Sequence, residues 1–377
     1  MRVIIAPDSF KGSLTASEVA DAVKIGINRY DEEIETMKVP LSDGGEGMVE
    51  ALVAATGGEI IETKVKDPLG RERESYFGIL GTGETAVVEM AAASGLPLLE
   101  EAEYNPLETT TYGTGQLIEK ALDYDISKLI IGIGGSATND GGVGMAQALG
   151  GRFLDQAGQE IDGTGAGLAD LATVDLSDLD PRLEEIEIEV ACDVDNPLVG
   201  ENGAAHIYAP QKGASAGDVK RLDQNLEHLA TVIKEELGQE VSQQPGAGAA
   251  GGLGAGLLTF LDAELNSGIE IVSETLNLGA KIKEADLVIT GEGALDHQTA
   301  NGKVPVGVAK VAQEFDVPVV AIAGTVKEDA KQLYKSGIDG MTSIISAPIT
   351  LQESMAQAEE LIIETVIRVM HLLDINI

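Results

Sequence analysis

The sequence predicts an α/β fold in which a domain with a parallel sheet is interrupted by a second α/β domain with a mixed sheet. Strand-like apolar runs alternate with helical patterns near both ends of the chain, as in βαβ units. Between Glu59 and Val88 the pattern instead alternates in polarity and contains turn signals, which favours a mixed sheet. A chain of 377 residues also exceeds one average core. We therefore expect a discontinuous first domain, 1–60 plus 285–377, and an inserted domain, 61–284.

The N-terminal segment predicts a strand, a loop and a helix. Val3–Ala6 is a short apolar run of the kind found in buried strands. Thr15 and Glu18 have the spacing of a capping box, so a helix is expected to begin there. Further along, a glycine-rich loop, Pro40–Gly47, leads into another predicted helix, Met48–Ala55.

The α/β alternation continues toward the C-terminus. Ala285–Thr290 predicts a strand, Gly291–Gly302 a loop, Val304–Phe315 a helix and Val317–Ala323 a further strand. This order is typical of the Rossmann-like parallel sheet expected for the first domain. Before it, Ala216–Leu237 has leucines spaced for one face of an amphipathic helix.

The most informative segment is a glycine-rich loop, Gly132–Gly142, which follows an apolar run and precedes a predicted helix, Val143–Leu149. Such a joint directs backbone N–H groups and the positive end of a helix at one place, where an anion binds. Glycines also let the backbone approach a phosphate closely. Polar side chains for the same site come from Ser136, Thr138, Asn139 and Asp140.

Other nucleotide-binding motifs are weak or absent. No segment matches the Walker A pattern. Gly132–Ala137 and Gly246–Gly251 imitate the dinucleotide fingerprint, but Asn139 and Asp140 delay the helix after the first, and no buried strand precedes the second. The second segment is about as consistent with a hinge or a tightly packed helix start as with a ligand loop.

Charged residues in three loops are further candidates. Lys11 follows the first strand, where open α/β sheets bind ligands, although a lone loop lysine is commonly just solvated. Asp43 and Glu46 precede a helix, as caps, metal ligands or a general base. Asp193 and Asp195 face the same side of an extended segment, and two carboxylates so close favour a cation such as Mg²⁺.

Composition excludes several classes of partner. The net charge of −38 comes from 63 acidic and 25 basic residues, without the basic stripe that nucleic acid or an anionic membrane would require. A solvated acidic surface, as in a salt-tolerant cytoplasm, explains this charge better than a role in binding an acidic substrate does. The single cysteine excludes an intramolecular disulfide and a cysteine-based zinc site. With no signal peptide or membrane span in the sequence, a cytoplasmic location is expected.

Several loops together resemble the type 1 glycerate kinases. The matching segments follow one another in order along nearly the whole chain: Ile5–Ser13, Ser42–Gly47, Gly134–Gly142, Ala191–Leu198, Pro210–Ala214, Gly246–Gly254, and Thr290–Asp296 with Gln298, Gly302 and Lys303. The resemblance implies ATP-dependent phosphorylation of D-glycerate with Mg²⁺, with 2-phosphoglycerate favoured over 3-phosphoglycerate as the product. It also implies two α/β domains, with the active site in the cleft between them.

The resemblance marks positions, and on these positions we infer the following roles. The expected catalytic residues are Lys11, Asp43 and Asp296, with either aspartate orienting the attacking hydroxyl. The expected cofactor-binding residues are Gly134, Gly135, Ser136, Asn139, Lys212, Glu292 and Lys303. The expected Mg²⁺ ligands are Asp193 and Asp195.

Two other functions remain open at this point. The glycine fingerprints would also suit a nicotinamide-dependent oxidoreductase, and the acidic composition would suit a non-catalytic cation-binding protein. Besides the small-molecule substrate, no nucleic-acid or membrane partner is expected, and a homodimer is compatible with the sequence.

Overall fold

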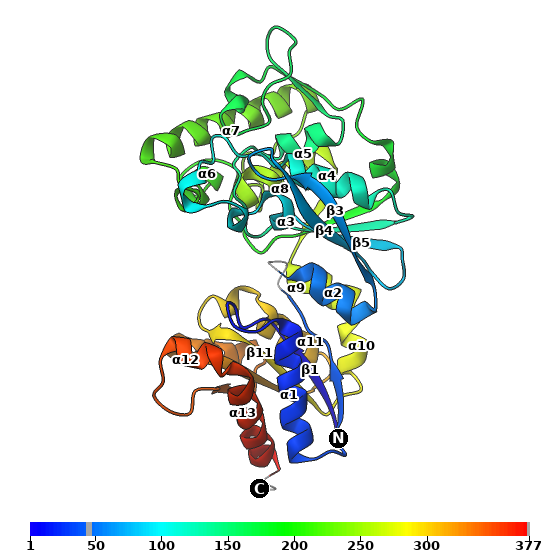
Figure 1. The fold of residues 1–377 in the computed structure, drawn as a ribbon, viewed down its shortest axis with the longest axis vertical. Helices are drawn as coiled ribbons and strands as arrows, with labels where there is room; N and C mark the ends of the chain where they lie inside the picture. Colours follow the sequence, from blue (N-terminus) through cyan, green and yellow to red (C-terminus); the bar gives the residue numbers. More distant parts are fainter. Residues whose placement is uncertain (43–46, 375–377) are drawn as a thin grey trace. The chain divides into compact units, whose positions relative to one another are not determined.

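A computed structural model describes residues 1–42 and 47–374 and divides the chain into two compact units (Figure 1). The first comprises Met1–Asp43, Ala54–Thr56 and Ile269–Ile377, and the second comprises Gly44–Val53 and Gly57–Gly268. Each unit has its own sheet, and one is parallel and the other mixed, which confirms the expected fold class. The domain limits expected from the sequence, 1–60 plus 285–377 and 61–284, stay predictions.

The first unit is built on a five-stranded sheet in the order β13-β12-β11-β1-β2, and every neighbouring pair is parallel. Its strands are β1 (Arg2–Pro7), β2 (Glu35–Lys38), β11 (Leu287–Leu295), β12 (Val319–Val326) and β13 (Gly340–Ser343). Its helices are α1 (Ala16–Tyr30), α9 (Gly268–Thr275, whose first residue belongs to the second unit), α10 (Leu278–Ile282), α11 (Val304–Gln313), α12 (Leu351–Ala356) and α13 (Ala358–Leu373).

Helix α1 shows how local sequence and packing agree. Thr15 and Glu18 form the predicted capping box, in which the Thr15 hydroxyl accepts from the Glu18 backbone at 3.2 Å. The apolar face of α1 packs on the sheet and against α13. Gly26 makes this close approach possible, because a Cβ there would lie 2.8 Å from the Cβ of Val366.

The predicted boundary that differs most from the structure in this unit is the end of β11. The sequence predicts a loop from Gly291, but β11 continues to Leu295. Neighbours on both sides explain the extension: Gly291 pairs with Pro7 of β1, and Leu295 pairs with Val326 of β12. Ladder hydrogen bonds from these strands outweigh the low strand preference of the glycines.

The second unit is built on a six-stranded sheet in the order β10-β9-β6-β5-β4-β3, parallel from β10 to β5 and antiparallel from β5 to β3. Its strands are β3 (Glu59–Lys66), β4 (Glu72–Ile79), β5 (Thr85–Glu89), β6 (Lys128–Gly132), β9 (Glu187–Ala191) and β10 (Glu264–Asn266), and a separate pair is formed by β7 (Arg152–Leu154) and β8 (Thr173–Asp175). Its helices are α3 (Ala91–Ser94), α4 (Tyr112–Ala121), α5 (Val143–Ala148), α6 (Ala204–Tyr208), α7 (Ala216–Leu237) and α8 (Ala249–Phe260).

Two predicted helices in this unit are confirmed. The glycine-rich loop lies between β6 and α5, and α7 has the predicted bounds, with Leu222, Leu226 and Leu229 buried along one face. Helix α2 (Met48–Thr56) also begins where expected, although its residues are shared between the two units. Within the described residues, no helix is both long and apolar enough to cross a membrane.

Candidate active site

In the first unit, candidate residues gather at the carboxyl end of the parallel sheet. Strands β1 and β11 are neighbours, and the chain continues from them in opposite directions across the sheet, to β2 on one side and to β12 on the other. Ligands of open α/β sheets bind at such a switch point. The loop after β1 is tied to β11 by the Asp8 amide, which donates to the Gly291 carbonyl at 2.8 Å. Lys11 lies exposed in this loop.

Glu292 is the buried acid of this sheet edge, and its side chain is held by two donors. The Thr299 hydroxyl donates to Oε1 at 2.5 Å, and the Lys303 ammonium donates to Oε2 at 3.3 Å. Burial raises the pKa of Glu292, and the bonds from Thr299 and Lys303 oppose that rise. Lys303 therefore supplies a positive charge beside a carboxylate that would otherwise hold a proton more readily.

Asp296 follows β11 directly and forms an ion pair that the sequence did not indicate. The Lys327 ammonium donates to Oδ2 at 2.7 Å, and the Gln298 amide donates to Oδ1 at 2.8 Å. The Lys327 bond lowers the pKa of Asp296. Lys327 is the first residue after β12, so its position after a parallel strand was the signal that could have found it.

In the second unit, the glycine-rich loop is exposed at its start and buried at its centre. Gly134 and Gly135 are exposed, and Gly135 has a φ of +75°, a conformation that glycine adopts without strain. Ser136 and Asn139 are buried in the same loop.

Lys212 is brought to this loop from 74 residues away in the chain. Its ammonium donates to the Ser136 hydroxyl at 3.1 Å and to the Thr138 carbonyl at 2.6 Å, while only 2% of the residue is exposed. Burial lowers the pKa of Lys212 to about 7, and the charge of Asp140 opposes this change. The two hydrogen bonds leave one of the three ammonium hydrogens for another acceptor. We call these residues the Lys212 cluster: Ser136, Thr138, Asn139, Asp140 and Lys212.

Asn139 is the residue of this cluster whose side-chain amide is buried without a hydrogen-bond partner among the described residues. The residue is fully buried, yet neither its amide nitrogen nor its amide oxygen has a hydrogen-bond partner in the described part of the chain. Buried polar groups are almost always paired, because an unpaired one costs about 1–3 kcal/mol. A bound group that offers hydrogen-bond partners would remove this cost.

The segment 246–252 packs against the glycine-rich loop. Gly251 has a φ of +70°, and a Cβ there would lie 2.0 Å from the Thr138 carbonyl oxygen. The Gly141 amide also donates to the Gly251 carbonyl at 3.2 Å. Of the alternatives left open by the sequence, the structure shows a tightly packed helix start, leading into α8 without a preceding strand. The dinucleotide fingerprint therefore loses its structural context here.

The predicted Mg²⁺ ligands, Asp193 and Asp195, are exposed after β9. Asp193 Oδ1 already accepts from the Ser267 hydroxyl and the Gly268 amide, each at 3.0 Å. Among the residues with described positions, no three His, Cys, Asp or Glu side chains gather as a metal site. Mg²⁺ commonly takes only one or two protein carboxylates and completes its shell with water and phosphate. The pair therefore fits a Mg²⁺ bound together with phosphate oxygens, and not a self-contained protein site.

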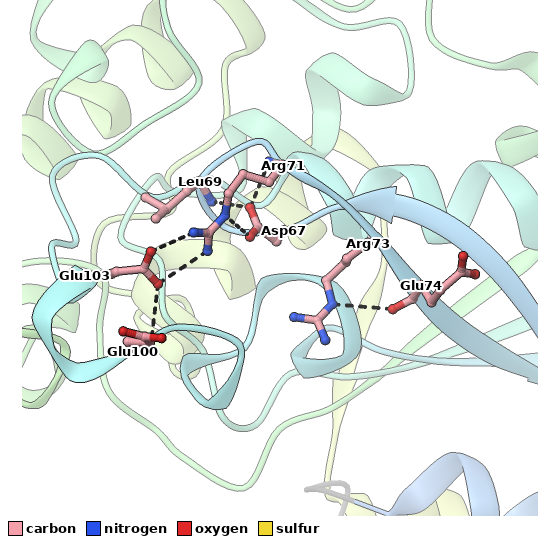
Figure 2. A network of polar contacts seen from close by, with 7 residues as sticks. All are labelled: Asp67, Leu69, Arg71, Arg73, Glu74, Glu100 and Glu103. Carbon is pink, nitrogen blue, oxygen red and sulfur yellow. Dashed lines mark hydrogen bonds and ion pairs between the residues drawn. The ribbon is translucent and has the colours of Figure 1, made fainter.

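A different polar network, shown in Figure 2, surrounds the turn after β3. Arg71 donates from Nε to Asp67 at 2.6 Å and from Nη1 to Glu103 at 2.6 Å, so its guanidinium is engaged by carboxylates of the same chain. A nearby cavity of about 510 Å³ is lined by Glu103, Glu108 and Asp218 among others. This negative lining does not suit an anionic ligand.

The predicted site residues thus fall into two groups. In the first unit, Glu292 lies within β11, and Lys11, Asp296 and Lys303 lie in the loops that follow β1 and β11. The rest of those described lie in the second unit, where a hydrogen bond joins Ser136 and Lys212 directly. Asp43 lies outside the described residues, and its role stays a prediction.

The structure is an α/β protein with glycine-rich loops and a buried lysine, and its sequence lacks a Walker motif. The chain belongs to the glycerate kinase family, whose model matches residues 3–374. It is 52% identical over 360 residues to the glycerate kinase of Bacillus subtilis strain 168, covering 96% of this chain and 94% of that protein. It is 51% identical over 358 residues to the glycerate 2-kinase of Escherichia coli K12, covering 95% and 94%. A solved structure assigned as glycerate kinase 2 from Salmonella typhimurium LT2 matches with a TM-score of 0.91 and 47% identity, covering 99% of this chain and 98% of that one.

Proposed function

We propose that this protein phosphorylates D-glycerate with ATP and forms 2-phosphoglycerate, as a type 1 member of its family. The observation that carries the proposal is the incomplete Lys212 cluster, where a buried ammonium and an unpaired amide await a ligand. Family membership over nearly the whole chain supports glycerate as the substrate. The similarity to a glycerate 2-kinase supports the choice of product.

The proposed phosphoryl transfer requires little covalent chemistry of the protein itself. A glycerate hydroxyl oxygen attacks the γ-phosphorus, the bond from that phosphorus to the bridging oxygen breaks, and ADP leaves with the electron pair while the hydroxyl proton passes to a base. Catalysis of such a transfer rests on positioning and on neutralising charge. In our proposal Gly134, Gly135, Ser136 and Asn139 cradle a phosphoryl group, and Lys212 balances its charge.

For the residues of the first unit we propose complementary roles. Lys11 and Lys303 balance negative charge on substrate or nucleotide, with Glu292 keeping the Lys303 ammonium in place. Asp296 or Asp43 orients the attacking hydroxyl. The depressed pKa of Asp296 keeps it ionised at neutral pH, so it can accept a hydrogen bond from that hydroxyl.

Mg²⁺ is the proposed metal, with Asp193 and Asp195 as its protein ligands. When bound, the ion would neutralise charge on the phosphates of ATP. Asp193 is the better placed of the two, because its hydrogen bonds from Ser267 and Gly268 restrict its carboxylate.

The test is direct. Purified protein is incubated with D-glycerate, ATP and Mg²⁺, and the products are followed by ³¹P NMR. We expect ADP together with a phosphate ester on the C2 oxygen. Absence of ADP formation would refute the kinase assignment, whereas an ester on the C3 oxygen would refute only the proposed position of transfer.

A further inference from the structure

Asp140 is a fully buried acid of the glycine-rich loop, to which the sequence assigned no individual role. Its Oδ2 accepts from the Thr111 amide at 2.7 Å, from the Thr111 hydroxyl at 2.8 Å and from the Gly144 amide at 3.3 Å, and its Oδ1 accepts from the Gly142 amide at 3.2 Å. Thr111 precedes α4, while Gly142 and Gly144 lie at the start of α5. One carboxylate therefore joins the first turns of two helices to the glycine-rich loop.

These contacts favour the ionised form of Asp140. Burial raises its pKa, and the bonds from Thr111, Gly142 and Gly144 oppose that rise. The Thr111 hydroxyl accepts from the Met145 amide at 2.9 Å, so its own hydrogen points to Asp140. The backbone amides of Thr111, Gly142 and Gly144 can only donate, so they stabilise the carboxylate and offer no acceptor to a carboxyl proton.

Asp140 also acts on Lys212. Asp140 lies two residues after Thr138, whose carbonyl accepts from the Lys212 ammonium at 2.6 Å, and both Asp140 and Lys212 are buried. The negative charge of Asp140 favours the protonated ammonium, while burial favours the neutral amine. These opposing effects leave the pKa of Lys212 at about 7, close to physiological pH.

We propose that Asp140 is the positioning residue of the Lys212 cluster: it anchors the glycine-rich loop to α4 and α5 and keeps Lys212 charged for an anionic ligand. This inference rests on the proposed function only for the identity of that ligand. Its central claim concerns Asp140 and Lys212 in the free protein, where no substrate is needed to test it.

The experiment measures the pKa of Lys212 directly. Protein labelled with ¹³C at the lysine ε carbons is titrated by NMR, and the Lys212 signal is identified by its loss in Lys212→Met. In Asp140→Asn, we expect the midpoint to fall by about one to three pH units, the usual effect of one close opposite charge. Asp67→Asn is the matched control, because Asp67 is a buried turn-capping aspartate of the same unit that is paired with Arg71. Its substitution should leave the Lys212 midpoint unchanged.

An unchanged midpoint in Asp140→Asn, or an equal fall in both variants, would overturn the proposal. If Asp140→Asn does not fold, Thr111→Val gives a second test, because it removes one donor and favours protonation of Asp140. It should lower the Lys212 midpoint by a smaller amount, and no change there would overturn the proposal as well.

Kinetics then separate this proposal from the proposed function. At pH 8, kcat/KM for ATP should fall about tenfold or more in Asp140→Asn and recover in part as the pH is lowered, since kcat/KM reports the free enzyme. A wild-type protein that forms no ADP would refute the proposed function but leave the NMR result standing. An active wild type with an unaltered pH profile in Asp140→Asn would refute the role of Asp140 alone.

Discussion

Replacement of Lys212 by methionine should preserve or increase stability while removing most activity. The difference between the ordinary lysine pKa of 10.5 and about 7 in this fold corresponds, at 1.36 kcal/mol for each pKa unit, to a cost on the order of 5 kcal/mol at pH 7 and below. Methionine fills a similar volume without that cost. The Ser136 hydroxyl keeps contacts with the Thr138 hydroxyl at 3.0 Å and the Ala250 carbonyl at 3.2 Å, so the bonds lost with Lys212 offset only part of the gain.

The sign of the pH dependence follows from proton binding. Between pH 7 and 10.5 the unfolded lysine holds a proton that the folded Lys212 has released. Wild-type stability therefore rises with pH across this window, whereas the Lys212→Met variant lacks that contribution. The advantage of the variant in the free energy of unfolding should be greatest at pH 7 and below and should vanish as the pH approaches 10.5.

Activity should respond in the opposite direction. A hydrogen bond to a charged group contributes about 1.5–3 kcal/mol, which corresponds to roughly ten- to a hundredfold in kcat/KM for ATP. Denaturant titration at several pH values and steady-state kinetics test both effects on the same Lys212→Met preparation. Loss of stability with retained turnover would refute this account, because it would make Lys212 a structural residue.

The remaining predictions concern packing, charge and salt. Gly251→Ala should lower the Tm by several degrees, because the new Cβ would clash with the Thr138 carbonyl, and calorimetry measures this. Lys303→Met should lower kcat/KM about tenfold or more in steady-state assays and shift the pH optimum upward, since Glu292 loses the cation that opposes its raised pKa. Thr15→Ala should cost about 1 kcal/mol of stability in denaturant titration, through loss of the helix cap, and leave turnover unchanged. Moderate KCl should raise kcat/KM for ATP, because it screens the repulsion between an anionic substrate and a chain of charge −38; a steady decline with salt would contradict this.

Local signals explain which elements could be predicted from the sequence. The capping box at Thr15 and the leucine spacing of Ala216–Leu237 depend on residues a few positions apart, and the structure confirms both helices. The glycine-rich loop Gly132–Gly142 was equally visible, because its strand, loop and helix are consecutive in the chain. In each case the physics that forms the element acts over a short stretch of sequence.

Long-range contacts explain what could not be predicted. The end of β11 depends on pairing with β1 and β12, which no property of Gly291 indicates. Lys212 was proposed from a motif, but its bond to Thr138 and its burial arise only when distant segments meet. The position of Lys327 directly after β12 could have indicated a site residue, but its pairing with Asp296 across 31 residues depends on the parallel sheet.

The net charge of the chain and the charge of the buried Lys212 cluster affect the binding of an anion in different ways. Exposed charges farther apart than about 8 Å are largely screened at physiological ionic strength, so the acidic surface acts mainly on the approach of a substrate. Within the Lys212 cluster, burial removes that screening, and a single ammonium held by Ser136 and Thr138 outweighs many distant carboxylates. Asp140 illustrates the same rule with the opposite sign, since burial raises its pKa and its four donor contacts oppose that rise. A strongly acidic protein can therefore bind anions, provided that its few buried cations are positioned by hydrogen bonds and not by net charge.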